Sequence, residues 1–310
     1  MNFREIPLVF DCQGSRLIGM AHVPDTIRTR GMLSVVAGGP QYRGGVCRMQ
    51  VQMARALAQT GVPVMRFDYR GMGDSEGSFR GFQDVEADLS SAIQAFQQRV
   101  PGLNEIVLWG GCDAASAILI NAWKFPAVTG MVVGNPWVHS DDTGDVVAIK
   151  HYSRRLHDRD FWLKLVRLQY NPLPAIATVA RGALLRLRSL TAQHPAPAET
   201  AASDDLLAPH LDRMRNGLAR YEGDLLLLMS GRSLVSKEFD ELVASQPGWQ
   251  QALRSQRHFV RHDMPDADQA FSSVASRAEA IAVTGSWMLD RHAMLTPADV
   301  IAAEQTSAPK

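Results

Sequence analysis

Strand-like apolar runs alternate with amphipathic segments over the first 137 residues, and this alternation constrains the fold more than any other feature. Consecutive parallel strands need a crossover connection, which is usually a helix, so the pattern predicts an α/β fold with a largely parallel sheet. A preceding segment, 6–24, is predicted to form two short antiparallel strands. The predicted strands are 31–39, 62–71, 104–111 and 128–137, and the predicted helices are 47–61, 81–100 and 113–125.

The alternation stops after residue 138. Helix-like segments dominate 139–221, which also contains the Pro- and Ala-rich stretch 191–203. Strand signals resume at 223–231 and 256–264, and a last helix is predicted over 271–292. We therefore expect a core built from 1–138 and 222–292, a helical cap or lid at 139–221, and a frayed tail at 293–310.

Composition excludes several classes of protein. Thirty-two Lys and Arg balance thirty-two Asp and Glu, so the chain carries no general signature of nucleic-acid binding. The three cysteines are far apart and fit neither a metal site nor a disulfide framework, which favours a reducing compartment. We expect no cofactor. We see no signal peptide and no apolar stretch of about 18 residues, so we expect a cytoplasmic protein.

The stretch "IVLWGGCDAASAIL" (106–119) is the main candidate for chemistry. An apolar strand runs into two glycines, then Cys112, then small residues that begin a helix. A nucleophile elbow needs such small neighbours because its backbone turns sharply between strand and helix. The helix dipole favours a thiolate at Cys112, whereas the carboxylate of Asp113 opposes it. The backbone N–H of Asp113 is a candidate oxyanion donor.

The segment "FDYRGMGDSEG" (67–77), between a strand and a helix, resembles the α/β-hydrolase family, and other landmarks follow in that family's order. The resemblance implies an α/β-hydrolase fold in which "VVAGGPQYRGG" (35–45) supplies a second oxyanion donor. Gly39 is our candidate for it, because Pro40 has no N–H to donate. Gln41 is the alternative. The 67–77 loop itself is expected to brace the fold.

The resemblance also fixes where a base and its orienting acid should lie. The acid position holds Ser233, and the histidine position, in "PDADQAF", holds Gln269, which cannot accept a proton near neutral pH. Glu238 and Asp240, which follow Ser233, are expected on a solvated helix face. His262 and His139 lie near strand ends and are the alternative bases, although each is more often a surface or structural residue. The sequence thus predicts an elbow without its usual activating groups.

Within the family, "GGPQYRGG", "RFDYRGMGDSEG" and "CDAASA" resemble the first hydrolase type of the exosortase A system, which tends to carry cysteine at the elbow. This resemblance implies a bacterial protein near exopolysaccharide export and protein sorting. Two hypotheses follow. One is a hydrolase or acyl transferase acting on an ester or thioester; the other is a degenerate homologue that binds an acylated or lipid-linked ligand, or a partner protein.

Residues 150–190 hold nine Lys and Arg against two Asp, within a chain of zero net charge. A basic solvated helix face is one interpretation. The other is peripheral contact with an anionic membrane or an anionic substrate, because aromatic and Leu residues accompany the charges.

Overall fold

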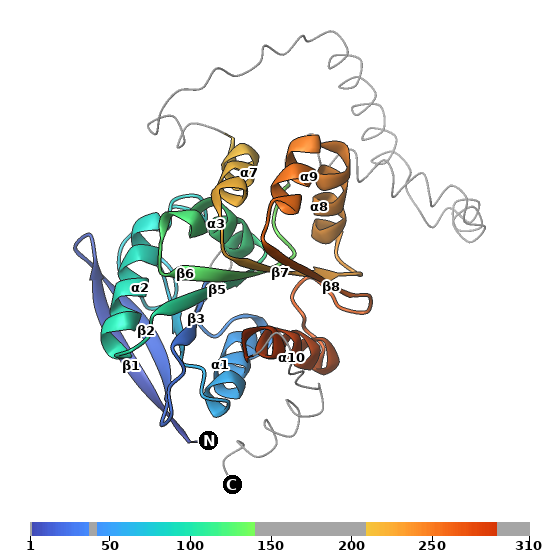
Figure 1. Ribbon diagram of the computed structural model, residues 1–310. Coiled ribbons are helices and arrows are strands. Elements are labelled where there is room, and N and C mark those ends of the chain that lie inside the picture. Colours follow the sequence, from blue (N-terminus) through green and yellow to red (C-terminus); the bar gives the residue numbers. More distant parts are fainter. Residues whose placement is uncertain (1, 37–41, 140–208, 290–310) are drawn as a thin grey trace, which may run out of the picture.

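The computed structural model describes residues 2–36, 42–139 and 209–289, which form one eight-stranded sheet with helices on both faces (Figure 1). The strand order is β1-β2-β4-β3-β5-β6-β7-β8. Strands β3 to β8 pair in parallel, while β2 pairs antiparallel with β1 and β4. The bounds are β1 Phe3–Cys12, β2 Ser15–Pro24, β3 Arg30–Ser34, β4 Val64–Phe67, β5 Glu105–Gly111, β6 Val128–Gly134, β7 Asp224–Ser230 and β8 His258–Met264.

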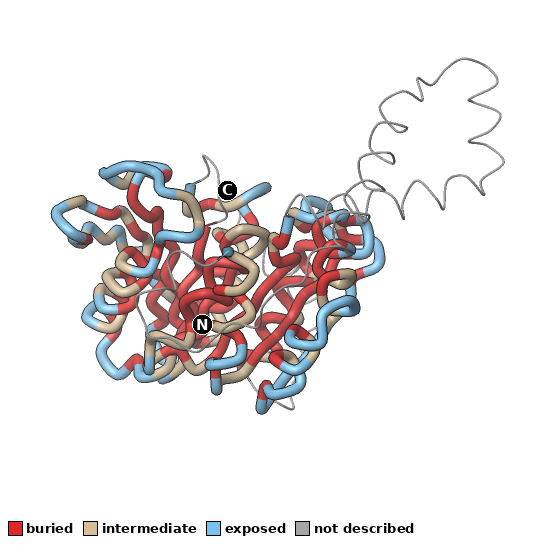
Figure 2. Tube along the Cα trace, turned by 90° about the horizontal axis from the view of Figure 1, so that it is seen from above, coloured by how far each residue is buried: buried red, intermediate tan, exposed pale blue. Residues whose placement is uncertain are grey.

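Helices cover both faces of the sheet, as the alternation predicts. Helices α1 and α10 lie together on one face, and the other described helices cover the opposite face (Figure 1). Buried residues run through the middle of the fold, and exposed ones gather at its rim (Figure 2). The helices are α1 Met49–Gln59, α2 Glu86–Arg99, α3 Asp113–Asn121, α7 His210–Arg220, α8 Leu234–Ser245, α9 Pro247–Arg254 and α10 Val274–Leu289, with short 3₁₀ turns at Val46–Arg48 and Ala122–Lys124.

The 67–77 loop is held by buried charge pairs. The Arg70 guanidinium donates to both carboxylate oxygens of Asp88, at 3.0 and 2.8 Å, and both side chains are almost fully buried. Asp68 accepts hydrogen bonds from the backbone and the side chain of Arg43, each at 2.5 Å. The loop therefore fixes Arg43, which lies within the 35–45 segment expected to supply an oxyanion donor, and so braces the fold.

The expected cap, 139–221, falls mostly outside the described residues. Its last part forms α7, which packs against α3 at close range. A Cβ added at Gly217 would lie 2.1 Å from the carbonyl oxygen of Leu119, so only glycine permits this approach. The helix-like segments 158–170 and 177–190, the basic 150–190 segment and the 293–310 tail lie outside the described residues. No helix in the described ranges is long and apolar enough to cross a membrane.

Candidate active site

Cys112 occupies a strained turn between β5 and α3. Its φ of 55° and ψ of −123° place a non-glycine residue in a region that L-residues seldom adopt. The Cys112 N–H donates to the carbonyl of Gly134, at 2.8 Å, and so ties the turn to the end of β6. A Cβ at Gly110 would lie 2.8 Å from the Ala114 Cβ, which explains the small residues around the turn. This is the backbone of a nucleophile elbow.

Gln269 contacts the Cys112 sulfur directly. Its Nε2 donates a hydrogen bond to Sγ at 3.1 Å, although 157 residues separate the two in the chain. The thiol in turn lies 3.5 Å from the Oδ1 of Asp113, to which it donates. No histidine within the described ranges lies within hydrogen-bond distance of this sulfur. The side chains that contact the sulfur are therefore an amide donor and a carboxylate.

The surroundings keep the thiol protonated. The pKa of Cys112 is raised to about 11, chiefly by burial and then by the negative charge of Asp113. The hydrogen bond from Gln269 and the backbone N–H of Asp113 act in the opposite direction, since both stabilise a thiolate. Burial also raises the pKa of the Asp113 carboxyl, while the sulfur contact and the charge of His210 lower it. Desolvation thus outweighs the groups that would activate the sulfur.

Asn135 fixes the loop that carries Gln269. It follows β6, is fully buried and has a φ of 47°. Its Nδ2 donates to the backbone carbonyl of Gln269, at 2.9 Å, and to the Ser230 Oγ, at 2.8 Å. Its Oδ1 accepts from the Ser230 N–H, at 2.8 Å, and from the Ser236 Oγ, at 2.7 Å. All its hydrogen-bonding capacity serves to join β6, β7, α8 and the Gln269 loop.

Comparison with known proteins identifies the fold that carries this geometry. A family model described as serine aminopeptidase, S33, matches residues 34–172. Among solved structures, the Pyrococcus furiosus esterase Pf2001 has a TM-score of 0.59 at 13% identity, covering 91% of this chain and 89% of that one. The chain has the α/β-hydrolase fold.

Two other solved structures share this fold. Est1E from Butyrivibrio proteoclasticus, with ferulic acid bound, gives a TM-score of 0.55 at 12% identity, covering 91% of this chain and 98% of that one. An alpha-beta serine hydrolase homologue from Coxiella burnetii gives 0.53 at 13% identity, covering 90% and 94%. No curated protein matches the chain. At these identities the likeness shows the fold alone.

The carboxyl ends of the parallel strands bring several of the predicted residues to one edge of the α/β-hydrolase sheet. Cys112 and Asp113 follow β5, Ser233 follows β7, and Gln269 follows β8. Ligands of open α/β sheets bind in the crevice at this edge. Gly39 and Gln41, the candidate donors after β3, lie outside the described residues.

Ser233 caps the start of a helix. Ser233 is the N-cap of α8, and its Oγ accepts a hydrogen bond from the Ser236 N–H at 3.4 Å. Its side chain is almost fully buried, at 2% exposure. A serine in this role satisfies a backbone donor at the start of the helix and carries no charge to orient a base.

The two alternative bases, His262 and His139, contact residues other than Cys112. The His262 Nε2 lies 2.9 Å from the Glu279 carboxylate on α10, and the His139 Nδ1 lies 3.3 Å from Glu238 on α8. Neither histidine contacts the Cys112 sulfur. The expectation that Glu238 lies on a solvated face is wrong: it is 8% exposed and faces His139. Asp240 is partly exposed and binds Arg261 at 2.7 Å.

A cavity of about 260 Å³ adjoins the sulfur. Its walls come from the start of α1, the end of β5 and the loop after β8, and they are mainly apolar. Gly45, Val46, Met49, Gln50, Trp109, Gly111, Cys112, Gln269, Ala270 and Phe271 line it, and we call it the Cys112 cavity. A space of this size accommodates a short acyl or aryl group beside the thiol.

Two titratable groups near Asp113 were not anticipated from the sequence. The charge of Asp113, after burial, raises the pKa of the buried Tyr69 phenol. Burial lowers the pKa of His210, at the start of α7, and Asp113 counteracts part of this effect. The two residues approach Asp113 from segments that are remote in sequence, so no local motif signals them.

Proposed function

We propose that the Cys112 cavity binds a small acyl ester or thioester, as an esterase-type site does, and that it turns such compounds over poorly. The hydrogen bond from the Gln269 Nε2 to the Cys112 Sγ carries this proposal. For acyl transfer, the thiol must lose its proton as the sulfur bonds to the carbonyl carbon, and the alcohol or thiol must then leave with a proton. A glutamine amide donates protons in hydrogen bonds and does not take one up near neutral pH.

Binding is supported by the parts of the site that do not depend on a base. The elbow backbone, the Asp113 N–H beside the sulfur and the apolar Cys112 cavity remain in place. In hydrolases that lose triad members, oxyanion stabilisation and binding alone leave roughly 10³–10⁴-fold catalysis over water. We therefore infer that affinity for acyl compounds is retained while turnover is low.

A catalytic test separates binding from turnover. Hydrolysis of p-nitrophenyl acetate and butyrate is measured for the wild type, Cys112→Ala, Gln269→His, and Gln269→His combined with Ser233→Asp. We expect wild-type rates close to those of Cys112→Ala, and a rise of at least about 10²-fold in the double variant, since general-base catalysis contributes typically 10²–10⁴-fold. The triple variant that adds Cys112→Ala is the matched control and should lose this gain.

The alternative, a working cysteine hydrolase or acyl transferase, is favoured by the strained φ of Cys112. It requires a base from outside the described residues or from the substrate. Wild-type turnover far above that of Cys112→Ala, accompanied by an acyl adduct on Cys112 in mass spectrometry, would establish it and would refute the proposal of poor turnover.

The link to the exosortase A system remains a proposal that rests on the sequence motifs around Cys112 and residues 35–77. It predicts that the natural ligand carries an acyl or lipid-linked group belonging to exopolysaccharide export.

Peripheral membrane contact through residues 150–190 is also a proposal, supported by the net charge of +7 in this segment. Co-sedimentation with vesicles containing phosphatidylserine should be strong at low salt and weak at high salt. Binding that is absent at low salt, or unchanged at high salt, would contradict it.

A further inference from the structure

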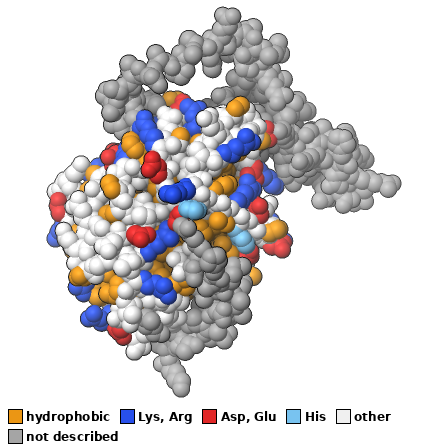
Figure 3. Space-filling model, in the orientation of Figure 1, with side chains coloured by type: hydrophobic (Ala, Val, Ile, Leu, Met, Phe, Trp, Pro, Cys, Tyr) orange, Lys and Arg blue, Asp and Glu red, His pale blue; other side chains and the backbone are white. Residues whose placement is uncertain are grey.

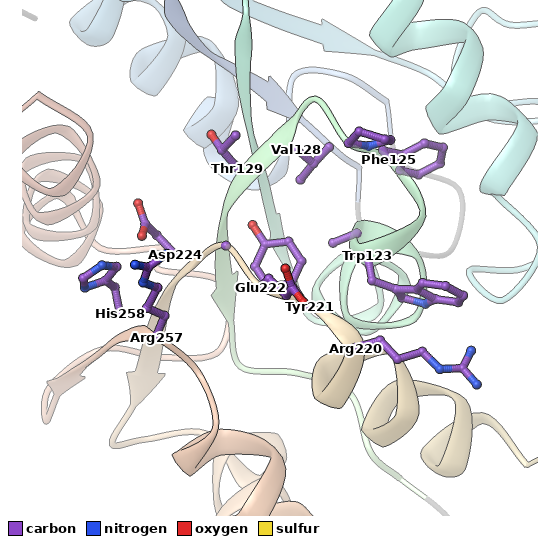
Figure 4. Close-up of a pocket in the computed structure, with 13 residues that line it drawn as sticks. Trp123, Phe125, Val128, Thr129, Arg220, Tyr221, Glu222, Asp224, Arg257 and His258 are labelled. Carbon is purple, nitrogen blue, oxygen red and sulfur yellow. The ribbon is translucent and has the colours of Figure 1, made fainter.

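A second, larger pocket lies at the opposite edge of the sheet from Cys112. Its volume is about 480 Å³, within the range of ordinary ligand sites. The starts of β6, β7 and β8, the 3₁₀ turn Ala122–Lys124 and the end of α7 surround it (Figure 4). We call it the amino-edge pocket; Ala122, Trp123, Phe125, Pro126, Val128, Thr129, Arg220, Tyr221, Glu222, Gly223, Asp224, Arg257 and His258 line it.

One side of the amino-edge pocket is aromatic and apolar. Trp123 and Phe125 are partly buried, and Tyr221 is 5% exposed, so the rings are held in place by the fold. The Arg220 guanidinium lies 4.6 Å from the centroid of the Trp123 ring and supports it from outside. Arg220 is also the last residue of α7, where a cation favours the helix dipole, so its charge already has a structural role.

The other side carries an arginine and a histidine, Arg257 and His258. Figure 4 shows Arg257 and His258 beside Asp224, with Tyr221 between them and Trp123. Asp224 already binds Arg30, at 3.0 Å. Within the described part of the chain, Arg257 forms no ion pair with a carboxylate, and it is exposed at the pocket. Glu222 is the acidic group that remains to offset the charges of Arg220 and Arg257.

Acidic and basic side chains are interspersed over the face shown in Figure 3. Selectivity for an anion must therefore come from the local placement of Arg257 and His258 rather than from the overall field.

We propose that the amino-edge pocket binds a small organic monoanion with an aromatic body, an aryl carboxylate. The carboxylate would meet the Arg257 guanidinium, whose fork geometry suits it, with His258 as a second donor. The ring would lie against Tyr221 and the Trp123–Phe125 side. A single negative charge suits Arg257, which forms no ion pair with a carboxylate of the described residues. This site is independent of the acyl chemistry proposed at Cys112.

Equilibrium binding of naphthoate to the full-length protein tests the proposal, with calorimetry as the readout. We expect saturable binding by the wild type, at least tenfold weaker binding of the uncharged naphthamide, and at least tenfold weaker naphthoate binding by Arg257→Gln. Arg254→Gln is the matched control: it removes an exposed arginine three residues away that does not line the pocket. Its affinity should stay within about twofold of the wild type.

Two further variants locate the bound ligand. Trp123→Leu should weaken naphthoate binding, whereas Cys112→Ala should leave it unchanged, because Cys112 lies at the other edge of the sheet. Absence of saturable binding, equal affinity for naphthamide, or full affinity in Arg257→Gln would overturn the proposal. Loss of binding in Cys112→Ala would also overturn it, by assigning the ligand to the Cys112 cavity. None of these outcomes bears on ester turnover.

Discussion

Alkylation of Cys112 by iodoacetamide tests the electrostatic account of the elbow. The thiolate is the reacting species, so the rate follows its population. With a pKa of about 11, about 10⁻⁴ of the Cys112 thiols are ionised at pH 7, against about 3% for an ordinary thiol with a pKa near 8.5. At equal intrinsic reactivity, Cys112 should therefore react about 300-fold more slowly at pH 7 than an ordinary thiol.

Two variants should move this rate in opposite directions. Asp113→Asn removes a negative charge that raises the thiol pKa, so alkylation at pH 7 should accelerate. Gln269→Leu removes a hydrogen bond that lowers this pKa, so alkylation should slow further. Asp25→Asn, which neutralises an exposed carboxylate remote from the site, is the control and should have no effect.

The assay follows the tryptic peptide of each cysteine by mass spectrometry between pH 6 and 11. Cys47 is exposed and serves as an internal reference, and Cys12 is buried. The Cys112 rate should still be rising at pH 10. A Cys112 rate that matches Cys47 at pH 7 and levels off near pH 9 would show that burial and Asp113 do not control the sulfur.

Three further predictions concern stability, each read from urea unfolding. Asn135→Ala should lower the free energy of unfolding by about 2–4 kcal/mol, since it leaves buried partners such as Ser230 unsatisfied. A loss below about 1 kcal/mol would contradict the role of Asn135 in joining these segments. Asp88→Asn should cost about 3–5 kcal/mol, because Arg70 keeps a buried charge without its counter-ion; a neutral result would mean that the pair is solvated. Burial lowers the pKa of His22 to about 3, so the unfolded chain binds more protons below pH 6.5 and stability should fall as the pH drops from 6.5 toward 3. His22→Gln should flatten this dependence, and an unchanged slope would assign it to other groups.

Much of the fold could be predicted from the sequence because its signals are local. The alternating apolar runs give the order of strands and helices, and the glycines before Cys112 mark the elbow. The position of Gln269 was also predictable, because the motif "PDADQAF" directly follows the last strand. In the structure the Gln269 Nε2 lies 3.1 Å from the Cys112 sulfur.

The remaining features depend on contacts between distant segments. Asn135 reads as an ordinary turn residue after a strand, yet its partners lie 95, 101 and 134 residues away. Glu238 sits in a helix with polar neighbours, which suggests solvent, and only the tertiary fold brings it to His139. Burial of the thiol and its raised pKa likewise depend on the packing of β6 and the loop after β8 around β5.

The backbone of the site explains why side-chain replacement alone should alter its chemistry. Cys112, Asn135 and Phe271 all have a positive φ at the same edge of the sheet, and such positions cost roughly 1–3 kcal/mol each unless the surrounding structure determines them. Here the Asn135 hydrogen bonds and the hydrogen bond from the Cys112 N–H to the Gly134 carbonyl hold the backbone in this conformation.

Neither set of bonds involves the Gln269 or Ser233 side chain. Replacing these two side chains by His and Asp should therefore leave the elbow unchanged, although Asp must take over the capping of α8, a role that it fills as well as serine does. A gain in Cys112-dependent esterase activity with unchanged unfolding free energy would then report proton transfer alone. A loss of stability without any gain would show that residue 269 contributes to the backbone and would refute this separation of geometry from chemistry.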